Sequence, residues 1–148
     1  MIALPDFEEQ SMYDAETAFH LMLREDRLGK FLAHWEAFKI ASSLPGFVVE
    51  CGVFKGTSFM RFAIMRQLLG GMASAKLVGF DVFSDAFPDT AFEEDQAQRD
   101  HWIATAGGSS IGKDQLEGIL HSKGIHNFEL VAGDATTTVP EWARTNPG

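Results

Sequence analysis

Apolar residues recur at helical spacing in the first third of the chain. Residues 11–26 begin with Ser11 and Asp14, which have the spacing of a capping box at a helix start. A second amphipathic stripe predicts a helix over residues 27–43, which Pro45 and Gly46 end. The apolar residues of this stripe are expected to form a helix core: Leu28, Phe31, Leu32, Trp35 and Phe38.

Short apolar runs then alternate with helical patterns. The runs at residues 47–51, 76–81 and 127–132 predict three buried strands, separated by helices over residues 57–69 and 113–123. Glycines follow both helices, at Gly70–Gly71 and at Gly124. Strands that alternate with helices predict a parallel sheet wound by right-handed crossovers, with strand order 3-2-1. The predicted fold class is therefore α/β, a Rossmann-like β-α-β-α-β half preceded by two helices.

The segment 82–112 has the least regular pattern. Aromatic residues alternate with acidic ones and glycines break the chain again, so we expect a long loop with a helix near residues 92–104. Long loops in compact domains are often lids, and His101 and Trp102 are its candidates for contact with a substrate. Residues 136–145 predict one more helical turn. The expected organisation is residues 1–44 as N-terminal helices and 45–148 as a ligand-binding half-domain.

Composition limits the classes of partner. The chain has 148 residues, a formal net charge of −9 and a sequence pI near 4.9, so a nucleic-acid partner is not expected. No stretch approaches the length of about 18 apolar residues needed to span a bilayer. Residues 1–10 lack the basic start of a signal peptide. Cys51 has no second cysteine to pair with, which fits a reducing, cytoplasmic compartment, and we expect Cys51 to pack in the core.

Each predicted strand ends in a carboxylate or a glycine turn. Glu50 and Gly52 follow the first strand, Asp81 closes the second, and Gly133 and Asp134 follow the third. The carboxyl ends of parallel strands meet at one edge of a sheet, where α/β proteins bind ligands. The sequence therefore predicts a binding rim at this edge.

The residue types of the rim indicate a ligand that carries both acidic and amino groups together with a ribose. A helix start at Gly56, with Thr57 and Ser58 after it, suits a carboxylate or phosphate. Asp81 suits a ribose diol and Asp134 an exocyclic amine such as that of adenine. An ammonium group would pair with Glu50, which explains a carboxylate at the end of a buried strand. S-adenosylmethionine carries all these groups.

Three motifs in the same order resemble the macrocin O-methyltransferase (TylF/MycF-like) family of class I S-adenosylmethionine-dependent methyltransferases. They are VVECGVFKGTS, GFDVFSDAFPD and VAGDATTTVP, and the similarity runs from about Pro45 to Pro140. Phe54 stands where the general E-x-G-x-G-x-G pattern has its middle glycine, as this family allows. The rim residues form the predicted cofactor site: Glu50, Gly52, Phe54, Gly56, Thr57, Ser58, Asp81, Phe83, Gly133, Asp134 and Ala135.

The resemblance implies an O-methyltransferase that acts on a hydroxyl of a sugar or another small natural product. It also implies a divalent metal (Mg²⁺) and a catalytic base, carried by a fourth strand and later segments that this sequence does not contain. Without that strand, residues 47–51 would form an apolar, unpaired edge that invites pairing with another chain. We therefore expect either a longer protein or a homo-oligomer. No metal-ligand or catalytic residue is predicted within the chain.

Two alternatives remain open. The chain is a non-catalytic remnant that keeps cofactor binding or association, which the missing fourth strand favours. Alternatively, it is a nucleotide-dependent oxidoreductase, which the four-residue spacing of Gly52 and Gly56 disfavours because G-x-G-x-x-G is not met.

Overall fold

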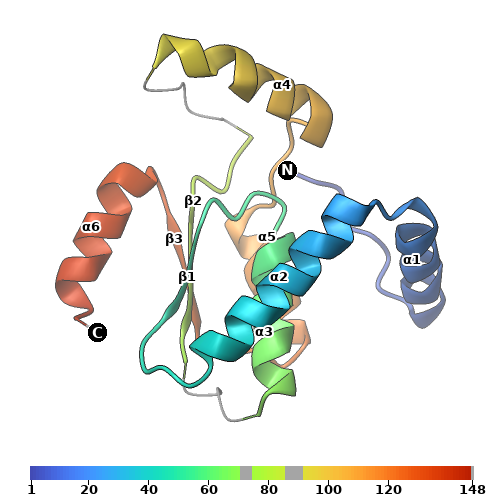
Figure 1. Cartoon of the computed structure of the whole chain (residues 1–148), viewed down its shortest axis with the longest axis horizontal. Coiled ribbons are helices and arrows are strands. Elements are labelled where there is room, and N and C mark those ends of the chain that lie inside the picture. Colours follow the sequence, from blue (N-terminus) through green and yellow to red (C-terminus); the bar gives the residue numbers. More distant parts are fainter. Residues whose placement is uncertain (71–74, 86–91, 148) are drawn as a thin grey trace. The chain divides into compact units, whose positions relative to one another are not determined.

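The computed structural model describes residues 1–70, 75–85 and 92–147, in two compact units. Residues 3–44 form one unit, with helices α1 (Glu9–Met22) and α2 (Glu25–Ala41) (Figure 1). The residue before α1 is Glu8, whose side chain makes no capping hydrogen bond. The predicted capping box at Ser11 is therefore wrong. The helix begins at Glu9 instead, with this acidic residue in the first turn, where the helix dipole favours negative charge.

The predicted apolar stripe of α2 is only partly buried. Phe38 is the buried residue of this helix, whereas the side chains of Leu28, Phe31 and Leu32 are exposed. The expectation that the whole stripe forms a core is wrong. A repeat of apolar residues predicts a helix, but burial also requires a facing element, and the repeat does not specify one.

The second unit contains a parallel sheet in the order β1-β2-β3, as the sequence predicts. Val48 pairs with Leu77, and Leu77 pairs with Phe128. The strands lie within one residue of the predicted runs, because a short apolar run bounded by turn residues is a strong strand signal. Its elements are β1 (Val48–Cys51), α3 (Thr57–Leu68), β2 (Leu77–Asp81), the 3₁₀-helix η1 (Glu93–Asp95), α4 (Gln96–Ala106), α5 (Lys113–Ser122), β3 (Phe128–Ala132) and α6 (Ala135–Thr145).

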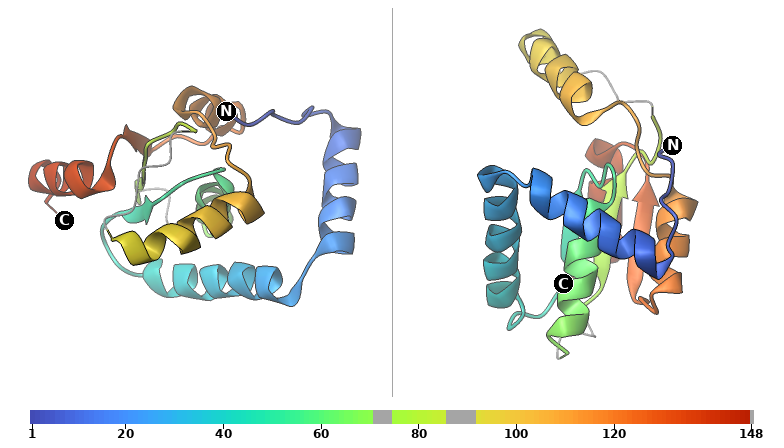
Figure 2. Two further views of the ribbon diagram at one scale, coloured as in Figure 1. Left: turned by 90° about the horizontal axis from the view of Figure 1, so that it is seen from above. Right: turned by 90° about the vertical axis from the view of Figure 1, so that its right-hand side faces the viewer.

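The sheet has helices on both faces, with α3 and α5 on one side and α6 on the other (Figures 1 and 2). Side chains alternate between these faces, so Leu77 and Leu130 lie in the core with α3 and α5, whereas Phe80 points toward α6. Gly79 follows Leu77 by two residues and therefore faces the same α3 side of the sheet. A Cβ built there would lie 3.0 Å from the ring of Phe59, so glycine lets α3 pack close to the sheet.

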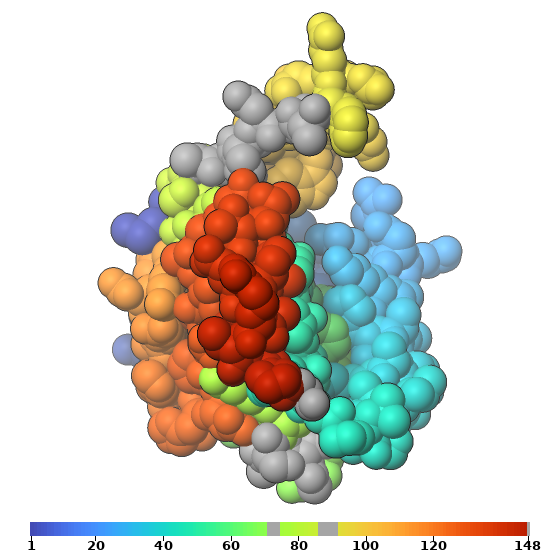
Figure 3. Space-filling model, turned by 90° about the vertical axis from the view of Figure 1, so that its left-hand side faces the viewer, coloured from blue at the N-terminus to red at the C-terminus, as the bar shows by residue number. Residues whose placement is uncertain are grey.

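Helix α6 is longer than the single turn predicted and continues through Pro140. Trp142 anchors α6, with its ring centroid 4.9 Å from that of Phe47 and 5.8 Å from that of Phe80. Figure 3 shows α6, in red, across this face of the unit. Cys51 is exposed, so its predicted place in the core is wrong. It pairs in register with Phe80 but lies on β1, the edge strand of the described sheet, which leaves it exposed.

The predicted lid, residues 82–112, contains η1 and α4, and its residues 86–91 lie outside the described part of the chain. Gly71, predicted to help end α3, also lies outside it. Among the described residues, no helix combines the length and the apolar character that a membrane crossing requires. The cytoplasmic location stays a prediction.

Candidate cofactor site at the carboxyl ends of the strands

Asp81 joins the loops that follow the first two strands. Its Oδ2 accepts a hydrogen bond from the backbone N–H of Phe54 at 2.8 Å, and its Oδ1 accepts one from the N–H of Phe83, also at 2.8 Å. Its backbone carbonyl accepts from the N–H of Gly133, after β3, at 2.9 Å. A carboxylate has about four lone-pair positions, so two remain for hydroxyl donors of a ligand.

The two glycines of the loop after β1 have different surroundings. Both have a positive φ, +85° at Gly52 and +79° at Gly56, which favours glycine. A Cβ built at Gly52 would meet no described atom within 4 Å, so space for a ligand adjoins this residue. A Cβ at Gly56 would lie 3.3 Å from Leu116 Cδ1. Gly56 thus allows close packing of the loop on α5 as well as the start of α3.

Phe54 replaces a glycine of the general pattern and nevertheless has a φ of +53°. Its carbonyl accepts hydrogen bonds from the N–H of Ile111 at 2.9 Å and from the hydroxyl of Ser110 at 2.8 Å. With the bond to Asp81, both backbone polar groups of Phe54 are fixed. These bonds offset the strain of a left-handed conformation at a residue with a Cβ.

Glu50 lies on the α3 face of the sheet. The hydroxyl of Ser58, in the first turn of α3, donates a hydrogen bond to Glu50 Oε1. Ser58 therefore has two roles: it orients the Glu50 carboxylate, and it lies in the first turn of α3, where a ligand anion could bind. Thr57, beside it, is exposed at the same helix start. This end of the rim combines a carboxylate with a helix N-terminus, so it suits a zwitterionic ligand.

Asp134 is the N-cap of α6, with Ala135 the first helical residue. Its Oδ1 accepts hydrogen bonds from the hydroxyl of Thr136 at 2.7 Å and from the Thr136 N–H at 2.8 Å. These bonds, the hydroxyl bond first, hold the pKa of Asp134 below its ordinary value. Asp134 is exposed and stays ionised at neutral pH, so its carboxylate can accept from a ligand amine.

Phe83 does not line the rim with its side chain. The ring is 7% exposed and packs in the main hydrophobic cluster, so the predicted cofactor contact is limited to its backbone, whose N–H is bonded to Asp81. The place of Phe83 in the cofactor site stays a prediction, and it can concern only the backbone of this residue. The φ of Phe83 is +51°, which turns the chain and the ring inward after β2.

Helix α4 makes two contacts with the loop after β1 that the sequence did not predict. The ring centroids of Trp102 and Phe54 lie 4.7 Å apart, and Lys55 Nζ donates to the carbonyl of Ala106 at 2.6 Å. Trp102, predicted to face a substrate, is thus in contact with the loop after β1. His101 is exposed on the same helix. No sequence spacing relates residues 54 and 102, so these contacts were not predictable.

Residues 110–111 were also missed as part of the site. Besides its bond to Phe54, Ser110 donates its N–H to Asp85 Oδ1 at 2.8 Å. Asp85 also pairs with the N-terminal ammonium of Met1, which, with the Ser110 bond, holds its pKa below the ordinary value. A pair of serines in a glycine-rich run predicts a loop and carries no signal for this clamp.

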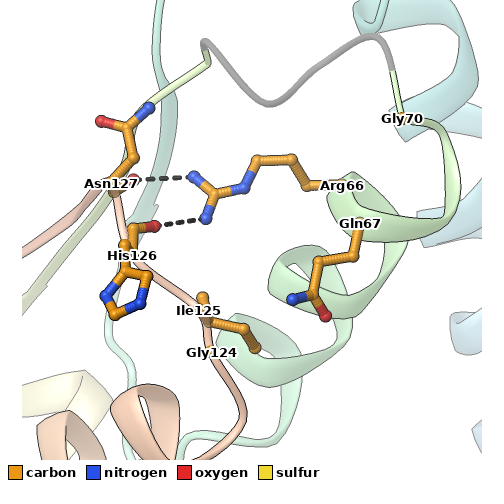
Figure 4. Close-up of a pocket in the computed structure, with 7 residues that line it drawn as sticks. All are labelled: Arg66, Gln67, Gly70, Gly124, Ile125, His126 and Asn127. Atoms are coloured by element: carbon orange, nitrogen blue, oxygen red, sulfur yellow. Dashed lines mark hydrogen bonds between the residues drawn. The ribbon is translucent and has the colours of Figure 1, made fainter.

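A pocket of about 370 Å³ lies at the opposite edge of the sheet, at the amino ends of the strands (Figure 4). The guanidinium of Arg66 donates to the carbonyls of Ala75 at 2.8 Å, Asn127 at 2.7 Å and His126 at 2.6 Å. Burial lowers the pKa of Arg66. The guanidinium joins α3 to the starts of β2 and β3, so we interpret this pocket as structural and separate from the rim.

The described residues do not fit a metal ion. Within residues 1–70, 75–85 and 92–147, no three histidine, cysteine, aspartate or glutamate side chains converge in a way that would hold one. The carboxylates of Asp81 and Asp134 are instead bonded to backbone and hydroxyl donors. We therefore assign no role to a metal here.

Comparisons with known proteins agree with the fold. No family model and no curated protein matches the chain, so membership of the macrocin O-methyltransferase family stays a prediction. A solved structure described as CalS11, calicheamicin methyltransferase, is similar with a TM-score of 0.65 and 20% identity over 97% of this chain. An apo structure of CalS11, described as TDP-rhamnose 3′-O-methyltransferase, has a TM-score of 0.56 and 22% identity over 97%. The chain spans 57% and 55% of these proteins, and shares their Rossmann-like α/β fold over that length.

Proposed function

We propose that this chain binds S-adenosylmethionine at the rim and forms the cofactor-binding part of an O-methyltransferase for a hydroxyl of a sugar or a related small molecule. The observation that carries the proposal is Asp81, whose carboxylate is held between two loops beside the open space at Gly52. The likeness to structures described as a calicheamicin methyltransferase and a TDP-rhamnose 3′-O-methyltransferase supports the choice of reaction.

The rim offers complementary groups for each part of this cofactor. Glu50, oriented by Ser58, would pair with the ammonium group, and the N-terminus of α3 would face the carboxylate. Asp81 would accept from the ribose hydroxyls and Asp134 from the adenine amine. The cofactor supplies a methyl group on a sulfonium. The part of these residues is to bind and orient it, and positioning of this kind accounts for much of the rate of such transfers.

Calorimetric titration with S-adenosylhomocysteine tests the cofactor site. Loss of a charge-assisted bond predicts that Asp81→Asn weakens binding by about 1–3 kcal/mol, about 5- to 150-fold. The control is Glu141→Gln, the same change at an exposed carboxylate of α6, which should bind like the wild type. A wild-type chain that binds no S-adenosylhomocysteine at millimolar concentration contradicts the proposal.

A modified ligand separates a direct contact from a structural role of Asp81, because this carboxylate also holds two backbone N–H groups. The 2′-deoxy form of S-adenosylhomocysteine should bind the wild type more weakly, whereas Asp81→Asn should no longer distinguish the two ligands. Equal discrimination by both proteins would exclude the ribose contact. Methyl transfer to TDP-rhamnose, the acceptor named for the similar structure, then tests the reaction itself. Binding without transfer to this or other sugar nucleotides would favour a cofactor-binding chain without catalysis.

A further inference from the structure

Phe54 is in contact with both the cofactor rim and helix α4. Its N–H donates to Asp81, its carbonyl accepts from Ser110 and Ile111, and its ring packs against Trp102. A change in the φ or ψ of Phe54 would therefore move two groups together, the N–H that donates to Asp81 and the ring that contacts Trp102. A glycine at this position would keep the backbone bonds but would have no ring to place against α4.

Lys55 provides a second contact with the same helix. Its ammonium donates to the carbonyl of Ala106, in the last turn of α4, where the helix dipole favours a positive charge. Trp102 and Ala106 are four residues apart, so both contacts lie on one face of α4. Two consecutive loop residues thus hold the end of α4 that is nearest to the rim.

We propose that Phe54 and Lys55 are positioning residues that couple cofactor binding to the docking of α4. The proposal rests on the proposed function, because it assigns the ligand of Asp81 to S-adenosylmethionine or S-adenosylhomocysteine. The left-handed conformation of Phe54, with a φ of +53°, is uncommon for a residue with a side chain, and three backbone bonds and one ring contact maintain it. A ligand that binds Asp81 therefore favours the loop conformation in which Phe54 and Lys55 contact α4.

Such coupling must be reciprocal. If the ligand stabilises docked α4 by some factor, docking of α4 increases the affinity for the ligand by the same factor. Couplings of this kind are typically about 5- to 150-fold. A residue that merely adds stability to α4 would change the opening of this helix without changing ligand affinity, so the two measurements together distinguish coupling from structural support.

Hydrogen exchange of the α4 amides measures docking, with the N–H of Gly107, bonded to the carbonyl of Ile103 at 2.9 Å, at the end of the helix. Saturating S-adenosylhomocysteine should slow exchange of residues 96–107 in the wild type by about fivefold or more. Trp102→Ala should abolish this slowing and raise the calorimetric Kd for S-adenosylhomocysteine by the same factor. Trp102 is 43% exposed, so we expect the variant to remain folded.

Three further variants complete the experiment. Trp102→Phe keeps a ring and should retain most of the coupling, whereas Lys55→Met should weaken it in both measurements. Gln98→Ala, at an exposed position of α4, is the matched control and should behave as the wild type.

The outcomes separate the coupling from the cofactor site. Wild-type binding without any change in α4 exchange overturns the coupling and leaves the cofactor site intact. An unchanged Kd in Trp102→Ala also overturns it, even if α4 exchanges faster. A wild-type chain that does not bind S-adenosylhomocysteine overturns the proposed function, and the coupling with it.

Discussion

Replacement of Arg66 by methionine should destabilise the sheet unit strongly. The side chain is 5% exposed and its guanidinium makes three hydrogen bonds of 2.6–2.8 Å to the carbonyls of residues 75, 126 and 127. A hydrogen bond to a charged group contributes about 1.5–3 kcal/mol, so the three together have an upper range of about 5–9 kcal/mol. Two effects reduce this value. Water that enters the adjoining pocket can donate hydrogen bonds to some of these carbonyls, and the substitution removes the desolvation cost of the guanidinium.

The expected net loss in the free energy of unfolding is therefore about 2–4 kcal/mol. With a urea m-value of about 2 kcal/mol/M, the unfolding midpoint of Arg66→Met should fall by about 1–2 M. Gln67→Ala, at an exposed residue that lines the same pocket, is the control and should leave the midpoint nearly unchanged. A midpoint for Arg66→Met within about 0.2 M of the wild type would refute the view that Arg66 joins α3 to the sheet.

Two further predictions concern the sheet. Gly79→Ala places a Cβ 3.0 Å from Phe59 Cε2 and 3.0 Å from Val53 Cγ2, and both of these side chains are buried. Overpacking should therefore lower the free energy of unfolding by about 1–3 kcal/mol and lower the thermal midpoint. An unchanged midpoint would show that the two neighbouring side chains move without an energetic cost. The hydrogen bond from Lys76 Nζ lowers the pKa of Glu129. The ionised Glu129 carboxylate therefore stabilises the folded state above its unfolded pKa of about 4.3, and this stabilisation is lost as the pH falls through the lower folded pKa. Lys76→Met should therefore flatten the decline of thermal stability on acidification, and a decline as steep as that of the wild type would contradict this assignment.

The strands and crossover helices were predictable because their signals are local. An apolar run followed by Gly52 or by Asp81 and a non-helical segment predicts a strand end wherever the strand lies in the fold. Helix α6 was underestimated because Pro140 reads as a helix breaker, although the Asp134 cap and the packing of Trp142 allow the helix to continue through it.

The environments of single side chains were less predictable. Cys51 ends a predicted strand and Phe83 follows another by two residues, yet Cys51 is exposed at the sheet edge and Phe83 is turned into the core by a positive φ. The rim position of Asp81 followed from the strand pattern. Its bond to the N–H of Phe54, 27 residues earlier in the sequence, depends on the tertiary fold and leaves no sequence signal.

The parallel sheet of three strands imposes an order on folding during synthesis. Each pairing joins strands on either side of a crossover: Val48 pairs with Leu77, 29 residues later (77 − 48), and Leu77 pairs with Phe128, 51 residues later (128 − 77). The three described strands are parallel, so no pair of them can form a hairpin first. Contacts between distant residues slow folding because the intervening chain must be ordered before they form. The apolar residues of β1 leave the ribosome long before their partners on β2. We expect the nascent chain to expose them during that interval, which makes it a substrate for chaperones that bind extended apolar segments.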